Sequence, residues 1–150
     1  MGNYKVVKQA INYELANFLF NYFLLKREAV AHMYNTNMTY DTGILGTFTD
    51  KQVLNTYSIY GDPTFDTLLM KILPVMKKET GLDVVPTYSY ARMYKKGDEL
   101  KKHKDRPSCE ISTTLNLGGE PWPIFIDPTG SDNVIDEYKN IHKPNAPKGT

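Results

Sequence analysis

The sequence predicts an α+β domain in which helices come first and an antiparallel β unit follows. Three observations support this prediction. Apolar residues recur at helical steps early in the chain, a proline and a glycine frame a second helix, and apolar and polar residues alternate after Gly81. At 150 residues, 41% of them hydrophobic and 23% charged, the chain has an ordinary domain's composition. We therefore expect residues 1–150 to form a single domain.

The first helix is expected from Asn12 to about Met33. Apolar side chains recur there at steps of three and four residues, which places them on one helical face. They are Leu15, Phe18, Leu19, Tyr22, Phe23 and Val30. An aromatic stripe with this spacing is typical of a helix that faces a core, so we interpret it as packing rather than as a ligand site.

The second helix is expected between an N-cap at Asp62, with Pro63 in the first position, and a stop at Gly81. Pro74 lies inside this helix and removes one backbone hydrogen bond, so a kink or an early end is expected near it. Residues 35–60, between the two helices, have no sustained period and are expected to form a loop with one short strand at most. A loop of this length is often functional.

Three strands are expected after Gly81. The first is marked by alternation over residues 88–94 and is followed by a turn at 95–98. The second covers residues 111–117, and a Gly-Gly turn leads into the third, at 122–126. The polar residues after 130 are expected to form a surface excursion.

Composition excludes several kinds of partner. A net charge of +1 gives no overall field for nucleic acid or an anionic membrane. The most apolar run, residues 18–25, is too short to span a bilayer, and we find no targeting segment. Cys109 is the only cysteine, which excludes an internal disulfide and fits a reducing compartment. We expect a cytoplasmic protein without membrane or nucleic-acid partners.

One short stretch, "KKHKDRPSCE", contains residues suited to metal binding. His103 and Asp105 are two residues apart, so in an extended segment they point to the same side. A histidine and a carboxylate form two thirds of the facial triad that holds non-haem iron. The alternative is a solvated basic loop in which Asp105 pairs with Arg106. The spacing alone leaves both interpretations open.

A longer motif surrounds this pair. The run "YKKGDELKKHKD", with Tyr94, Gly97, His103 and Asp105, resembles the Y-x-x-G-x-x-x-x-x-H-x-D signature of prolyl 4-hydroxylase-like iron(II)/2-oxoglutarate dioxygenases. Residues 88–119 are similar to the branch of that family found in phage and marine microbes. The resemblance implies a double-stranded β-helix, or cupin-like jelly roll, buttressed by the N-terminal helices.

The resemblance also implies chemistry and site residues. His103 and Asp105 would be iron ligands, and the Tyr94 phenol would hydrogen-bond the distal carboxylate of the co-substrate 2-oxoglutarate. The implied activity is hydroxylation of a C–H bond, with a prolyl residue of a peptide or protein as the expected substrate, and with O₂ and 2-oxoglutarate converted to CO₂ and succinate. A phage-encoded protein would work in the host cytoplasm.

The sequence departs from the family pattern in two places. Pro121 follows "GGE" where many relatives have a threonine that contacts 2-oxoglutarate. The family's distal histidine and its basic 2-oxoglutarate clamp do not appear before Thr150, and the only later histidine, His142, has no strand pattern around it. We expect these groups, and the last strands of the fold, to lie beyond Thr150.

Two side chains near the motif have more than one interpretation. Arg92 is expected to lie at the surface with its stem on Tyr90, although it could also line the mouth of a pocket. Trp122 is expected in the core, or as a wall of the pocket.

Two other functions stay open. A metal-free β-sandwich could use its tyrosine-rich faces to bind peptide or sugar. A cupin-like metalloprotein could use the same barrel without 2-oxoglutarate.

Overall fold

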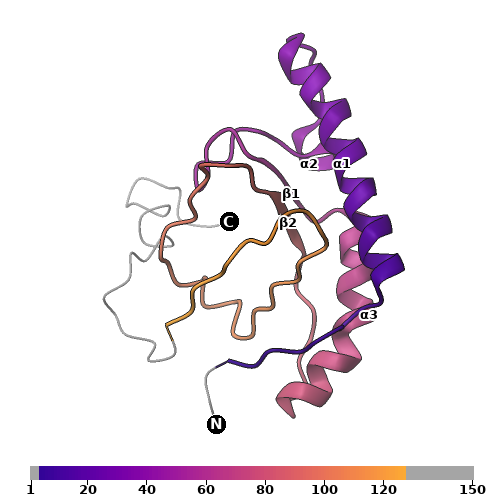
Figure 1. Cartoon of the computed structure of the whole chain (residues 1–150), viewed down its shortest axis with the longest axis vertical. Helices are drawn as coiled ribbons and strands as arrows, with labels where there is room; N and C mark the ends of the chain where they lie inside the picture. The colour runs from indigo at the N-terminus through magenta and orange to yellow at the C-terminus, as the bar shows by residue number, and fades with distance from the viewer. Residues whose placement is uncertain (1–3, 128–150) are drawn as a thin grey trace.

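The computed structural model describes residues 4–127 (Figure 1). Three helices and two strands are present in this range: α1 (Tyr13–Asn35), α2 (Thr42–Leu45), β1 (Tyr57–Tyr60), α3 (Pro63–Thr80) and β2 (Tyr90–Met93). In Figure 1, α1 and α3 run along one side of the molecule, and long irregular segments lie on the other side of the strands. None of the helices in the described range is long and apolar enough to cross a membrane.

The first predicted helix is confirmed as α1. The side chain of Asn12 caps it by accepting a hydrogen bond of 2.8 Å from the Leu15 N–H. Leu19, Phe23 and Val30 are buried, as the periodic pattern predicts. Phe18 is the exception, because its side chain is 67% exposed. It lies about 100° around the helix from Leu19, which turns it away from the core.

The second predicted helix is confirmed as α3, with both predicted ends. The Asp62 carboxylate accepts a 2.8 Å hydrogen bond from the Thr64 N–H, and Pro63 occupies the first position. Gly81 has a left-handed φ of 71° and donates its N–H to a carbonyl of the last turn, which glycine does at little cost. The prediction that this helix ends early near Pro74 is wrong, because α3 continues to Thr80. One missing hydrogen bond is tolerated in a helix that is well capped at both ends.

The strands form a two-stranded antiparallel sheet. β1 pairs with β2 so that Tyr57 lies opposite Met93 and Tyr60 opposite Tyr90. The first predicted strand, at residues 88–94, is confirmed as β2, which is shorter. β1 is the short strand expected within residues 35–60, a segment that also contains α2.

The core lies between α1, α3 and β1. Its buried residues are Leu19, Phe23, Val30, Tyr57, Ile59 and Phe65. The Phe23 ring lies 5.1 Å from Tyr57 and 5.3 Å from Phe65, between centroids, so aromatic contacts join the three elements. The core therefore forms from segments between residues 19 and 65.

The second and third predicted strands are wrong for the described structure, because residues 111–117 and 122–126 have no strand in it. Phe125 is 91% exposed and Ile124 is 60% exposed. Alternation of apolar and polar residues gives an extended segment one apolar face, but a strand also needs a neighbouring strand with which to pair. The described range thus holds helices and one small sheet, and the double-stranded β-helix stays a prediction.

Gly118, in the predicted Gly-Gly turn, lies close to α1. Gly118 lies against the ring of Phe20 on α1, and a Cβ at Gly118 would come within 2.9 Å of that ring. Leu117 packs against the core beside it. Glycine is needed here for close approach, and this contact ties the segment after residue 110 to α1.

Candidate functional site

The candidate metal ligands follow a turn that is anchored to β1. The turn predicted at residues 95–98 is confirmed, because the Asp98 N–H donates to the Lys95 carbonyl over 3.0 Å. The Asp98 carboxylate in turn accepts a 2.6 Å hydrogen bond from Thr56, whose residue is buried beside β1. Gly97 has a φ of 90°, a value that favours glycine, which explains this glycine of the motif physically.

His103 and Asp105 lie side by side, as their spacing predicts. The His103 Nε2 atom is 3.5 Å from an Asp105 carboxylate oxygen. The other ring nitrogen, Nδ1, lies 2.7 Å from the Lys101 carbonyl oxygen. Ser112 donates its hydroxyl to the second carboxylate oxygen of Asp105. Each side chain is thus oriented by a neighbour on the side away from the other.

The electrostatics of the pair favour a charged carboxylate. The hydrogen bond with His103 is the largest influence on Asp105 and lowers its pKa; burial opposes this, and the hydrogen bond from Ser112 adds to the lowering. The guanidinium of Arg106 lies over the Tyr88 ring, 4.7 Å from its centroid. Asp105 is therefore held as an anion by its own loop.

In one protonation state, His103 and Asp105 together offer two ligands for a metal ion. A neutral histidine with its proton on Nδ1 would donate it to the Lys101 carbonyl, and its Nε2 lone pair would then face the Asp105 carboxylate. In that tautomer the two acceptor atoms, 3.5 Å apart, would need a cation between them, whereas a proton on Nε2 would join them directly as the hydrogen bond that lowers the pKa of Asp105. The described residues contain no cluster of three possible protein ligands. His142 lies outside the described residues.

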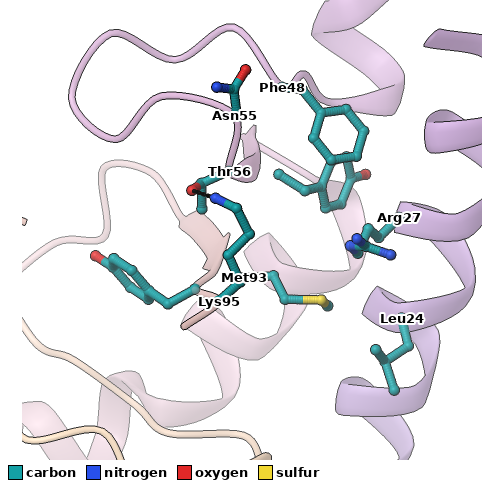
Figure 2. A pocket seen from close by; sticks show the side chains of 9 residues that line it. Leu24, Arg27, Phe48, Asn55, Thr56, Met93 and Lys95 are labelled. Carbon is teal, nitrogen blue, oxygen red and sulfur yellow. Dashed lines mark hydrogen bonds between the residues drawn. The ribbon is translucent and has the colours of Figure 1, made fainter. Parts of the chain in front are cut away.

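Tyr94, the third predicted site residue, lies where β2 ends. Its ring stacks on Trp122 with 4.9 Å between centroids, and its hydroxyl accepts a hydrogen bond of 3.3 Å from Arg92. Trp122 is 42% exposed and therefore forms a wall beside Tyr94 rather than a core residue. Tyr94 also lines a pocket of about 220 Å³ between α1, β2 and the segment before β1 (Figure 2).

The surface position expected for Arg92 is wrong. Its side chain is only 5% exposed, and its guanidinium itself lies over the Tyr90 ring at 5.0 Å. Nη2 donates to an Asp50 oxygen at 3.0 Å and to the Gln52 side chain at 2.6 Å. Burial alone would lower the pKa of Arg92, but Tyr94, Tyr90 and Asp50 outweigh it and raise the pKa.

Sequence reasoning missed this buried cluster because its parts are far apart in the chain. Asp50 and Gln52 come from the segment before β1, and Arg92 comes from β2. The alternation along β2 was the available signal, since it puts Tyr90, Arg92 and Tyr94 on one face. The acidic partner could not be chosen from sequence. The Nε atom of Arg92 is buried without a hydrogen-bond partner in the described structure.

Comparisons of this chain with protein-family models, with curated proteins and with solved structures found no match. The assignment of function therefore depends on the motif and on the geometry described above.

Proposed function

We propose that this protein is an Fe(II)- and 2-oxoglutarate-dependent dioxygenase that hydroxylates a C–H bond, with a prolyl residue of a peptide or protein as the substrate. One observation supports the proposal above the others. The two side chains that the motif assigns to iron point a ring nitrogen and a carboxylate oxygen at one another across 3.5 Å, in a loop that orients both.

The residues of the chain have separable roles in this proposal. His103 would ligate through Nε2 in its neutral form, because the Lys101 carbonyl accepts the proton on Nδ1. Asp105 would ligate as an anion, and Ser112 would hold its second oxygen in place. The bound iron would supply the oxidation, in which O₂ and 2-oxoglutarate become succinate, CO₂ and the new hydroxyl group.

Tyr94 is suited to bind the co-substrate. Its hydroxyl oxygen accepts a hydrogen bond from Arg92, so the phenol proton is available for donation to a carboxylate. Tyr94→Phe should therefore raise the concentration of 2-oxoglutarate needed for half-maximal turnover, while it leaves Mn(II) binding unchanged.

A second function is supported by a different observation. Aromatic side chains are exposed beside the sheet, with Tyr60 at 54%, Tyr90 at 43% and Trp122 at 42%. Such rings suit a metal-free module that binds peptide or sugar. Metal binding separates the two proposals. An oxygenase binds Mn(II) through His103 and loses it in His103→Ala, whereas a metal-free module shows no such difference.

A cupin-like metalloprotein that works without 2-oxoglutarate is the third alternative. It would bind metal like the dioxygenase but would be indifferent to Tyr94→Phe.

A further inference from the structure

The pocket beside Tyr94 is lined by both apolar and charged side chains (Figure 2). Leu24 of α1, Phe48 and Met93 of β2 supply the apolar side chains. Arg27 and Lys95 supply the charged ones. In Figure 2 the Arg27 side chain extends from α1 toward the space between Phe48 and Met93. A ligand in this pocket would meet hydrocarbon on one side and a cation on the other.

The two cations differ in how far they are already neutralised. Lys95 forms an ion pair with Asp98, whose side chain is only 6% exposed, and it also donates to Thr56 over 3.2 Å. Arg27 contacts one carboxylate among the described residues, that of its neighbour Glu28. Glu28 is 66% exposed and contacts only the Nη1 atom of Arg27. Exposed pairs of this kind are weak, so the Arg27 guanidinium can bind another anion.

The size of the pocket sets a limit on the ligand. A volume of about 220 Å³ exceeds the roughly 150 Å³ of an engineered apolar cavity that holds benzene. It is below the range of about 300 to 1,000 Å³ that is usual for drug-sized ligands. The pocket therefore has room for one small ring or short chain with a single polar group.

We propose that this pocket binds a small monocarboxylic acid with an apolar body. The carboxylate pairs with the Arg27 guanidinium, which matches carboxylate geometry through two parallel hydrogen bonds. The apolar body covers Leu24, Phe48 and Met93. Tyr94, the proposed 2-oxoglutarate contact, also lines this pocket, but the proposed monocarboxylate site requires neither iron nor His103.

The test is calorimetric titration of the full chain, without metal, with benzoate and with its neutral counterpart benzyl alcohol. Arg27→Gln removes the charge and keeps a polar side chain, and it should weaken benzoate binding at least tenfold. Leu24→Trp places a large ring among the apolar side chains of the pocket and should abolish benzoate binding. Lys77→Gln is the matched control, because it removes a cation that pairs with Asp83 outside this pocket. It should bind benzoate like the wild type.

The outcomes separate cleanly. The site is supported if the protein binds benzoate more tightly than benzyl alcohol and if Arg27→Gln weakens benzoate binding. The same affinities in His103→Ala would show that the site is independent of the proposed metal centre. Absence of benzoate binding to the wild type, equal binding of benzyl alcohol, or unchanged binding in Arg27→Gln would each overturn it. Binding of 2-oxoglutarate but not benzoate would also overturn it, since a second carboxylate would then be required.

Discussion

The part of the chain from α1 to β2 and the part from residue 99 to residue 127 are built differently. All of the buried residues among those described lie between Leu19 and Ile72. The later part has no helix or strand, and most of its side chains are exposed or half-buried. The candidate iron ligands nevertheless lie in that later part. The two candidate ligands are thus brought together by their own loop, while the core lies elsewhere in the chain.

Several contacts join the two parts. The Arg106 guanidinium lies over the Tyr88 ring, and Gly118 lies against Phe20 of α1. The linking residues 94–98 add two more, because Tyr94 stacks on Trp122 and Asp98 accepts a hydrogen bond from Thr56, next to β1. We therefore expect large changes in stability from substitutions in the first part, intermediate ones from these contacts, and small ones from the exposed residues of the later part.

The largest effect is expected in the core. Phe23→Ala removes a buried ring that contacts both Tyr57 and Phe65, and should lower the free energy of unfolding by about 3 to 5 kcal/mol. Urea unfolding followed by circular dichroism would measure it. A loss below about 1 kcal/mol would show that α1 is not packed as described.

A buried charge comes next. Asp62 caps α3 and accepts hydrogen bonds from Tyr22 and Lys26 of α1, with a side chain that is 0% exposed. Asp62→Asn keeps the cap but leaves Lys26 unpaired, which should cost about 3 kcal/mol. Asp83→Asn is the matched control, because Asp83 is 92% exposed in its pair with Lys77 and its loss should leave the stability almost unchanged. Equal effects of the two substitutions would contradict the account.

The same carboxylate gives a pH dependence. Burial alone would raise the pKa of Asp62, but hydrogen bonds from Lys26, Tyr22 and the Thr64 N–H outweigh it, so the folded-state pKa is lowered. The unfolded state thus takes up the proton first as the pH falls. The stability that Asp62 contributes is complete above its unfolded pKa, close to 3.8, and is lost as the pH drops through the folded value.

Unfolding measured from about pH 5 down to about pH 2 should therefore show a steeper acid loss in the wild type than in Asp62→Asn. Parallel curves for the two proteins would rule out Asp62 as a source of the acid dependence.

The contact between Gly118 and Phe20 should give an intermediate effect. Gly118→Ala brings a Cβ within 2.9 Å of the ring and should cost about 1 to 3 kcal/mol through displaced packing. Gly81→Ala would be a poor control, since its left-handed φ adds strain of its own. Gly43→Ala is better, because the nearest atom to its Cβ is a side-chain oxygen of Asp41 at 3.2 Å. If Gly118→Ala leaves the free energy of unfolding unchanged, residues 99–127 are not tied to α1 through this glycine.

The smallest effect is expected at Phe125. Its side chain is 91% exposed, so Phe125→Ser should change the free energy of unfolding by less than about 0.5 kcal/mol. A loss of more than about 2 kcal/mol in the same urea experiment would mean that this ring is covered by something outside the described residues.

The contrast between the two parts also explains what the sequence could predict. Both long helices were predictable because their signals are local: a cap at Asn12, a Pro63 start and a left-handed Gly81. The strand β2 was predictable from alternation. Its partner β1 was predicted only as one short strand within residues 35–60, and the sequence did not indicate which strand it pairs with. The strands expected at 111–117 and 122–126 failed because alternation does not specify a partner.

The candidate site divides in the same way. The approach of His103 to Asp105 follows from a two-residue spacing and was predictable. The burial of Arg92 was not, because it depends on Asp50 and Gln52, some forty residues earlier. An ion pair between distant residues leaves no periodic signal in the sequence.

The most direct test of the proposed function is succinate production by the full chain, supplied with Fe(II), 2-oxoglutarate and O₂ and offered proline-containing peptides. We expect succinate to form in the wild type and to fall by at least a hundredfold in His103→Ala, with a parallel loss of Mn(II) binding measured by electron paramagnetic resonance. The Lys104→Ala control, between the two ligands, should keep both. Wild-type protein that binds no Mn(II), or succinate production that His103→Ala leaves unchanged, would contradict the assignment.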